Sequence, residues 1–215
     1  MQRAMFQCLL GIACNDFVMI AADQTNTQGI FILKNDEDKI IPLADKLLMG
    51  VAGDAGDTAQ FSHYILRNLS LYKMRNGYKL GTNAAVHFVR KNMADSLRTS
   101  PYLINLLVGG YDEIDGAKLY YVDLLATNIC MPYVAHGFGG LFSISMLDYY
   151  YKPTLTESEA YNVLAQCVYE IHTRLFMNLP SFQVKVVNKK GVTTLPVICP
   201  ATFYTKEVPT NSDTT

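Results

Sequence analysis

The order in which two kinds of hydrophobic periodicity follow one another constrains this 215-residue chain most. Roughly the first fifty residues contain short apolar runs of strand length, whereas the next fifty contain apolar residues at intervals of three and four. The pattern then repeats as strands, helices and strands. Blocks segregated in this way are typical of α+β proteins. We therefore expect two sheets packed on each other with a helix pair outside each, a four-layer α-β-β-α sandwich.

The predicted strands are apolar runs bounded by turn residues. They comprise residues 8–13, 17–22, 30–33, 39–53, 103–111, 117–125, 182–187 and 192–195. The acidic segment at residues 35–38 is expected to be a solvated turn. The longest window without a charged side chain, residues 124–147, contains Pro132 and several glycines. It favours a strand, a turn and a helix start over a membrane-spanning helix.

The first two predicted helices have clear end signals. One begins with Asp54 or Asp57 as N-cap and ends near Gly77, and its apolar residues recur every three or four positions. The other begins at Thr82 and stops before Pro101.

Two more helices are predicted later in the chain. The glycine-rich turn at residues 136–140 leads into a helix over residues 142–150. Thr156 and Glu159 have the spacing of a capping box, which opens a helix with one continuous apolar stripe. No internal repeat or linker occurs, so we expect one domain over residues 1–205 and a polar surface tail over residues 206–215.

Composition excludes several classes of protein. Eighteen Lys and Arg against nineteen Asp and Glu leave a net charge of −1, which argues against a nucleic-acid binder and a membrane-surface protein. Half the residues are hydrophobic, so the chain is not intrinsically disordered. Only 17% are charged, where about 25% is usual for soluble domains. The deficit suggests that other protein chains cover much of the surface.

The five cysteines are odd in number, scattered and never in a CxxC pair. They indicate reduced thiols in a cytosolic or nuclear protein instead of a disulfide framework or a zinc site. The opening residues imitate a signal peptide, but Gln7 interrupts the apolar stretch. Secretion is therefore the weaker alternative. The chain has no GxSxG, HExxH, phosphate-loop or dinucleotide motif, so no cofactor and no metal are predicted.

Asp23 is the most informative charged residue. It ends the apolar run that begins at Phe17, where a buried carboxylate would need a partner. Lys39 stands just before another apolar run and can supply that partner. The alternative is that both side chains reach solvent.

Several stretches resemble one known family over nearly the whole chain, from about Cys8 to Tyr204. They are GDAGDTAQF…LYKMRNGY, KNMADSLR, NLLVGGYDE, AHGFGG and MNLPSFQVKVV. The chain resembles the β subunits of the 20S proteasome, and among them the non-catalytic members. The resemblance implies the four-layer fold of the N-terminal-nucleophile hydrolases, which agrees with the layering expected above.

In catalytic members of that family, a threonine exposed by cleavage attacks the peptide carbonyl, with help from a lysine, an aspartate and the backbone amide of a glycine. By resemblance, Asp23 matches the aspartate, Lys39 the lysine and Gly53 the glycine. Gln7 stands at the nucleophile position, preceded by Phe6 where processed members have glycine. A carboxamide is not a nucleophile. The resemblance therefore implies that Asp23, Lys39 and Gly53 are remnants and that no residue is catalytic.

Two further departures point the same way. Catalytic members keep a Ser-Asp-Ser set near the nucleophile, where this chain has Phe138, Leu175 and Asn178. Cys8 is the nearest substitute nucleophile, but a shift of one residue in a strand turns a side chain to the other face. We expect its thiol to point away from Lys39.

The resemblance implies a non-catalytic place in a seven-membered β ring of the 20S core particle, where two such rings enclose the chamber for ubiquitin-dependent proteolysis. The implied partners are other β subunits of the same ring, α-ring subunits and the opposite β ring, in cytoplasm and nucleus. No nucleic acid and no membrane are implied. Two alternatives stay open: an enzyme that uses Cys8, and a stand-alone binding module.

Overall fold

The structure is a computed structural model that describes residues 7–28 and 31–200. Its helices are α1 (Ala55–Asn76), α2 (Thr82–Ser96), α3 (Phe138–Tyr150) and α4 (Glu157–Arg174). Its strands are β1 (Leu9–Ala13), β2 (Phe17–Asp23), β3 (Asn26–Gln28), β4 (Phe31–Lys34), β5 (Ile40–Ala44), β6 (Leu47–Gly53), β7 (Ile104–Asp112), β8 (Gly116–Val122), β9 (Asn128–Cys130), β10 (Tyr133–His136), β11 (Phe182–Asn188) and β12 (Gly191–Ile198).

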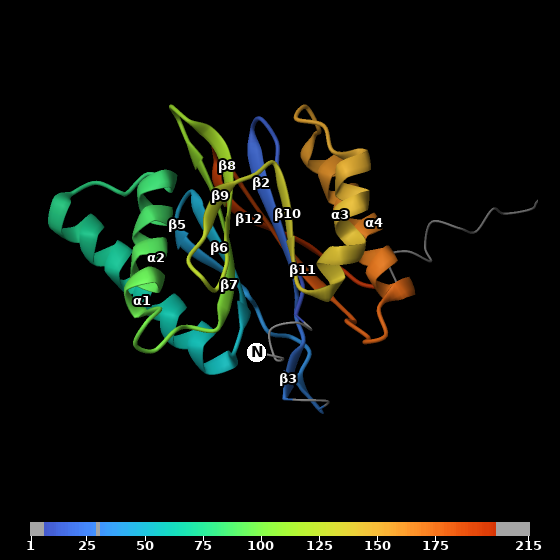
Figure 1. Ribbon diagram of the computed structural model, residues 1–215. Coiled ribbons are helices and arrows are strands. Elements are labelled where there is room, and N and C mark those ends of the chain that lie inside the picture. The colour runs from blue at the N-terminus through green and yellow to red at the C-terminus, as the bar shows by residue number, and fades with distance from the viewer. Residues whose placement is uncertain (1–6, 29–30, 201–215) are drawn as a thin grey trace, which may run out of the picture.

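The strands form two five-stranded antiparallel sheets that pack face to face (Figure 1). One sheet has the order β10-β1-β2-β11-β12 and is covered on its outer face by α3 and α4. The other has the order β5-β6-β7-β8-β9 and is covered by α1 and α2. The predicted α-β-β-α sandwich is confirmed.

Three layers of buried side chains hold the sandwich together, and β1 contributes to two of them by strand alternation. Leu9 packs between the two sheets, beside Ile20 and Leu107. Leu10 points the other way, into the core under α3 and α4. A third core lies between the second sheet and the α1–α2 pair. The sheets approach closely at Gly109, where a Cβ would lie 2.7 Å from Val18.

The predicted start and end of α1 and the predicted start of α4 are confirmed. Asp54 accepts a hydrogen bond from the Gly56 N–H at the start of α1. Gly77 ends that helix with a positive φ of 77°, which suits glycine. Thr156 and Glu159 form both hydrogen bonds of the capping box at α4.

The start of α3 corrects the sequence prediction, because the helix begins at Phe138 and includes the expected turn residues Gly139 and Gly140. A Cβ at position 139 would lie 2.7 Å from the Cys8 sulfur, and one at 140 would lie 2.9 Å from the Ala135 Cβ. These glycines therefore allow close packing of the helix on β1 and β10.

The strand predicted over residues 30–33 is present as β4, except that Ile30 lies outside the described residues, but β4 belongs to neither five-stranded sheet. Phe31, Ile32 and Leu33 are 70%, 52% and 63% exposed on β4. This strand pairs with β3 in a separate two-stranded sheet beyond the end of the sandwich (Figure 1). The polar sequence of β3 gave no apolar alternation from which to predict a strand.

The predicted tail at residues 206–215 lies outside the described residues, so its boundary stays a prediction. Within the described part of the chain, each helix is too short or too polar to cross a membrane.

Candidate functional site

Gln7, Asp23, Lys39 and Gly53 come together at one end of the layer between the two sheets. Gln7 lies two residues before β1, and Lys39 directly precedes β5. Asp23 ends β2 and Gly53 ends β6. The strands are antiparallel neighbours within each sheet, so these ends meet although the residues are as much as 46 positions apart.

Asp23 and Lys39 form a buried ion pair. Their side chains are 1% and 5% exposed, and the Lys39 Nζ donates to Asp23 Oδ2 over 2.8 Å. The same Nζ donates to the Thr25 carbonyl over 2.7 Å. The alternative prediction, that both side chains reach solvent, is wrong because the two sheets close over this end.

Backbone groups complete the coordination of Asp23. The Cys8 N–H donates to its Oδ1 over 2.7 Å and the Thr25 N–H to its Oδ2 over 3.1 Å. Burial raises the pKa of Asp23, while Lys39 and the two backbone hydrogen bonds oppose that rise. One carboxylate thus ties together β1, the start of the β3 segment and the residue before β5.

The Gln7 carboxamide is paired with the backbone of Gly53. Gln7 Oε1 accepts from the Gly53 N–H over 2.8 Å, and Gln7 Nε2 donates to the Gly53 carbonyl over 3.2 Å. Position 53 requires glycine, because its φ is 155° and a Cβ would lie 2.3 Å from the Leu103 carbonyl oxygen. Both hydrogen-bonding groups of this glycine are therefore occupied by one side chain.

The Cys8 thiol lies on the opposite face of β1, as predicted. Cys8 is fully buried in the core under α3 and α4, and its sulfur faces Gly139. Burial, with a smaller contribution from the Asp23 charge, raises the pKa of this thiol well above its ordinary value. The thiol is therefore protonated and separated from Lys39 by the strand itself.

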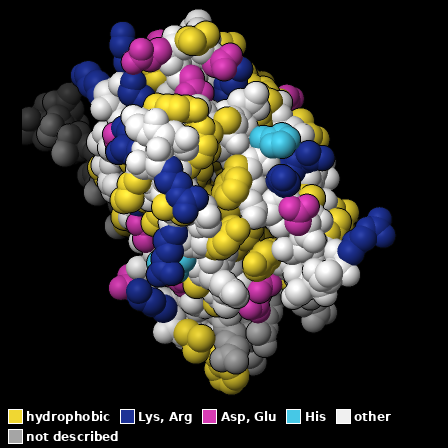
Figure 2. Space-filling view, turned by 90° about the vertical axis from the view of Figure 1, so that its left-hand side faces the viewer, with side chains coloured by type: hydrophobic (Ala, Val, Ile, Leu, Met, Phe, Trp, Pro, Cys, Tyr) yellow, Lys and Arg dark blue, Asp and Glu magenta, His cyan; other side chains and the backbone are white. Residues whose placement is uncertain are grey.

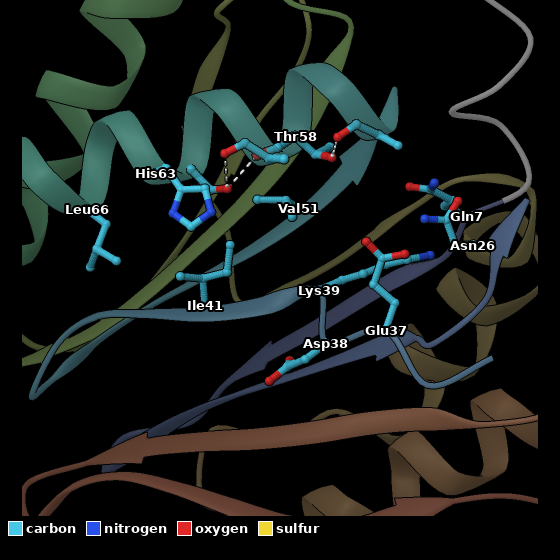
Figure 3. Close-up of a pocket in the computed structure, with 13 residues that line it drawn as sticks. Gln7, Asn26, Glu37, Asp38, Lys39, Ile41, Val51, Thr58, His63 and Leu66 are labelled. Atoms are coloured by element: carbon cyan, nitrogen blue, oxygen red, sulfur yellow. Dashed lines mark hydrogen bonds between the residues drawn. The ribbon is translucent and has the colours of Figure 1, made fainter. Parts of the chain in front are cut away.

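A cavity of about 280 Å³ opens beside this cluster, between α1 and β5. Gln7, Asn26, Glu37 and Lys39 gather at one end, while His63 and Leu66 of α1 stand at the other (Figure 3). Asn26, Glu37 and His63 were not predicted as neighbours of the site, because only the fold brings the β3 segment and α1 to the same opening.

A second buried lysine, Lys185, was not predicted as part of the site. Lys185 on β11 donates to Asp38 Oδ2 over 2.5 Å and to the Ile40 carbonyl over 2.6 Å. Lys185 thereby binds the residues on either side of Lys39 in the sequence. The sequence feature that could have revealed it is a lysine inside the apolar run at residues 182–187.

The remaining residues singled out by resemblance lie in the α3–α4 layer or after it. Phe138 begins α3, Leu175 follows the end of α4, and Asn178 is exposed beyond it. Phe6 lies outside the described residues.

Comparison with known proteins identifies relatives of this chain. The family model described as proteasome subunit matches residues 5–187. The chain is 40% identical to the proteasome subunit beta type-2-A of Arabidopsis thaliana, covering 86% of this chain and 91% of the relative. It is 41% identical to the proteasome subunit beta type-4 of Saccharomyces cerevisiae, covering 86% and 94%. The proteasome subunit beta type-2 of Caenorhabditis elegans is 38% identical, covering 85% and 94%. A family match over most of the chain, together with relatives at this identity and coverage, shows that the chain belongs to the proteasome subunit family.

Proposed function

We propose that this chain is a structural, non-catalytic β subunit of a 20S proteasome core particle. In this proposal it occupies one place in a seven-membered β ring, between two ring neighbours. An α ring lies on one side and the opposite β ring on the other. The particle degrades ubiquitin-marked proteins in cytoplasm and nucleus, and this subunit contributes shape and contacts to its chamber.

The observation that carries the proposal is the pairing of Gln7 with Gly53. In the catalytic arrangement implied by the family, the Gly53 N–H would donate to the developing oxyanion. Here Gln7 Oε1 accepts that hydrogen bond over 2.8 Å. The side chain at the nucleophile position is therefore unreactive and also occupies the donor that a reacting peptide would need.

The geometry of Cys8 argues against the alternative enzyme. A thiol attacks as the thiolate, and burial favours the neutral form at this position. We expect a small alkylating reagent such as iodoacetamide to modify the exposed Cys130 of the folded chain at least about a hundredfold faster than Cys8. Equal labelling of the two thiols, measured by peptide mass spectrometry, would restore Cys8 as a candidate nucleophile.

Exposed apolar side chains favour a subunit of an assembly over a stand-alone binding module. Helix α3 carries three large apolar side chains on its surface, since Leu141, Ile144 and Tyr149 are 70%, 41% and 79% exposed. Exposed apolar side chains that lie together often mark a protein–protein interface. In the proposed particle, neighbouring subunits cover this face.

Two measurements on the purified particle test the proposal. A covalent inhibitor directed at N-terminal threonines is expected to label catalytic subunits and leave this chain unmodified. Intact-mass analysis is expected to show a chain that retains residues ahead of Gln7. An inhibitor adduct on this chain, or a mature chain that starts at Cys8, would contradict a purely structural role. Native sizing of the full chain as a free monomer of 24.0 kDa in cells would favour the stand-alone module.

A further inference from the structure

The Glu37 carboxylate, which lines the cavity beside Gln7, is incompletely hydrogen-bonded. Its Oε2 is buried and accepts no hydrogen bond within residues 7–28 or 31–200. The backbone N–H of Glu37 donates to the Gln24 carbonyl over 3.0 Å, which fixes the position of the residue. Figure 3 shows the carboxylate directed across the cavity toward α1. A buried carboxylate oxygen without a donor is costly, so this arrangement indicates a group that supplies a donor.

The charged residues next to Glu37 in the sequence already have other partners. The Lys39 Nζ donates to Asp23 over 2.8 Å, on the side away from the solvent. Asp38 accepts a hydrogen bond from the Lys185 Nζ over 2.5 Å. Both lysines of this region are therefore committed to other carboxylates, and neither has an ion pair with Glu37.

Helix α1 brings no strong cation to this part of the cavity either. Residues 55–66, which include the α1 wall of the cavity, contain no Lys or Arg. Figure 2 shows the Lys and Arg side chains of the α1–α2 layer on its outer surface. His63 stands at the opposite end of the cavity from Glu37 (Figure 3). A cationic partner for Glu37 therefore has to come from outside the described wall of the cavity.

The segment that precedes Gln7 has the matching chemistry. Residues 1–6 lie outside the described residues and lead directly into Gln7, which itself lines the cavity. Their sequence, MQRAMF, contains Arg3 and no acidic residue. The Cα atom of Arg3 is at most about 14 Å from that of Gln7 along the chain. Alternate residues of an extended chain share one face, so an extended segment would present Arg3 and Met5 on the face of Gln7.

We propose that the cavity binds the N-terminal segment of its own chain, residues 1–6. The Arg3 guanidinium donates to Glu37 Oε2, which gives the buried oxygen a charge-assisted hydrogen bond. The flexible Met5 side chain packs on Ile41 and Val51, two apolar residues of the cavity wall. The occupied cavity is closed to the side chains of other peptides. This inference goes beyond the proposed function, because it does not require the chain to be in a particle.

Trypsin tests whether Arg3 is bound. Trypsin cleaves after an arginine that is free to enter its specificity pocket, so the rate follows the population of the released segment. We expect Glu37→Gln to be cleaved after Arg3 about tenfold faster than the unmodified full chain, because the charge-assisted hydrogen bond is lost. Intact-mass measurement over time follows the loss of the first three residues.

The matched control is Asp36→Asn, which removes a negative charge next to Glu37 in the sequence. Asp36 is 79% exposed and pairs with Lys34, so we expect cleavage after Arg3 at the unmodified rate. Cleavage after Lys190, in the exposed turn between β11 and β12, is expected to be equal in all three chains and shows that each is folded. Equal cleavage after Arg3 in Glu37→Gln and the unmodified chain would overturn the proposal.

Crosslinking locates the segment independently of proteolysis. A benzophenone amino acid in place of Met5, irradiated in the full chain, is expected to attach to residues 40–46 or 47–67 of the same chain. These two tryptic peptides contain Ile41, Val51 and the α1 wall of the cavity. Glu37→Gln in the same chain is expected to lower the yield. Attachment to another peptide or another chain contradicts the proposal, as does the absence of any adduct.

The failure of this inference can be distinguished from the failure of the proposed function. A chain that enters no particle contradicts the proposed function and leaves the trypsin result unaffected. A chain that keeps residues 1–6 but is cleaved after Arg3 equally with and without Glu37 contradicts only this inference. A mature chain that starts at Cys8 contradicts both, because it lacks the segment.

Discussion

Gln7 and Cys8 are consecutive residues that lie in opposite environments. Gln7 hydrogen-bonds Gly53 of the other sheet, beside the buried ion pair of Asp23 and Lys39. Cys8 faces α3 and α4, where the contacts are apolar and a glycine is needed for close approach. The two residues are neighbours in the segment that leads into β1. Their environments differ because their side chains point into different layers of the sandwich.

The comparison explains how a site can keep its charged residues without a nucleophile. The Asp23 carboxylate connects three segments of the chain through Lys39, Cys8 and Thr25. Removing either charge would leave the other buried without a partner, which costs more than keeping both. We infer that Asp23 and Lys39 stabilise the fold at this position. Gln7 has no ionic partner, and its carboxamide oxygen instead accepts the hydrogen bond of the Gly53 backbone N–H.

The largest effect is expected from Lys39→Ala. The substitution leaves the buried Asp23 carboxylate without its cation, and we expect the free energy of unfolding to fall by about 3–5 kcal/mol. Denaturant unfolding of the full chain measures the change. The control is Lys46→Ala, because the Lys46–Glu113 pair is largely exposed and should contribute less than about 1 kcal/mol. Equal losses for the two variants would show that the inter-sheet site does not depend on its ion pair.

The next effect concerns His136, a polar residue on β10 that lacks an ionic partner comparable to Lys39. Its Nε2–H donates to the Leu106 carbonyl over 3.3 Å, and its ring stacks on Tyr121. Burial lowers the pKa of His136 from 6.5 to about 4, against smaller opposing effects of Leu106 and Asp123. The unfolded chain therefore takes up a proton at a higher pH than the folded chain does.

The sign of the pH dependence follows from that difference. Stability should be complete above pH 6.5, decrease as the pH falls towards 4, and change little from this group below that. The total loss corresponds to roughly 3 kcal/mol. Unfolding measured at several pH values should show a weaker dependence in His136→Gln, whereas the exposed His87→Gln should keep the dependence of the unmodified chain. An unchanged dependence in His136→Gln would refute this assignment.

The smallest effect is expected from Gly139→Ala on the apolar side of the comparison. The new methyl group would lie 2.7 Å from the Cys8 sulfur, and overpacking of this kind costs about 1–3 kcal/mol. Gly56→Ala is the control, because its nearest neighbour is 3.4 Å away and alanine favours a helix.

Combining Gly139→Ala with a substitution of Cys8 sharpens this test. Cys8→Ala removes the sulfur that obstructs the methyl group, so its combination with Gly139→Ala should cost less than the sum of the two single losses. Simple additivity in this cycle of unfolding measurements would mean that the contact with Cys8 does not limit the packing of α3.

Features set by local interactions could be predicted from the sequence, whereas features set by distant contacts could not. The capping box at Thr156 and the cap at Gly77 are local, and both were predicted. The pairing of Asp23 with Lys39 was proposed from sixteen positions of separation, but burial of both decided it. The role of Gly139 could not be predicted as packing, because its neighbour Cys8 is far away in sequence.

The sequence by itself determined the layer order, the ends of α1 and the start of α4, because periodicity, caps and strand alternation depend on neighbours within a few residues. Only the tertiary structure decided that Gln7 hydrogen-bonds Gly53, that Lys185 supports the segment before β5, and that Glu37 lines the same cavity as Gln7. These contacts join segments separated by dozens of residues, and their geometry is set when the sheets and helices pack.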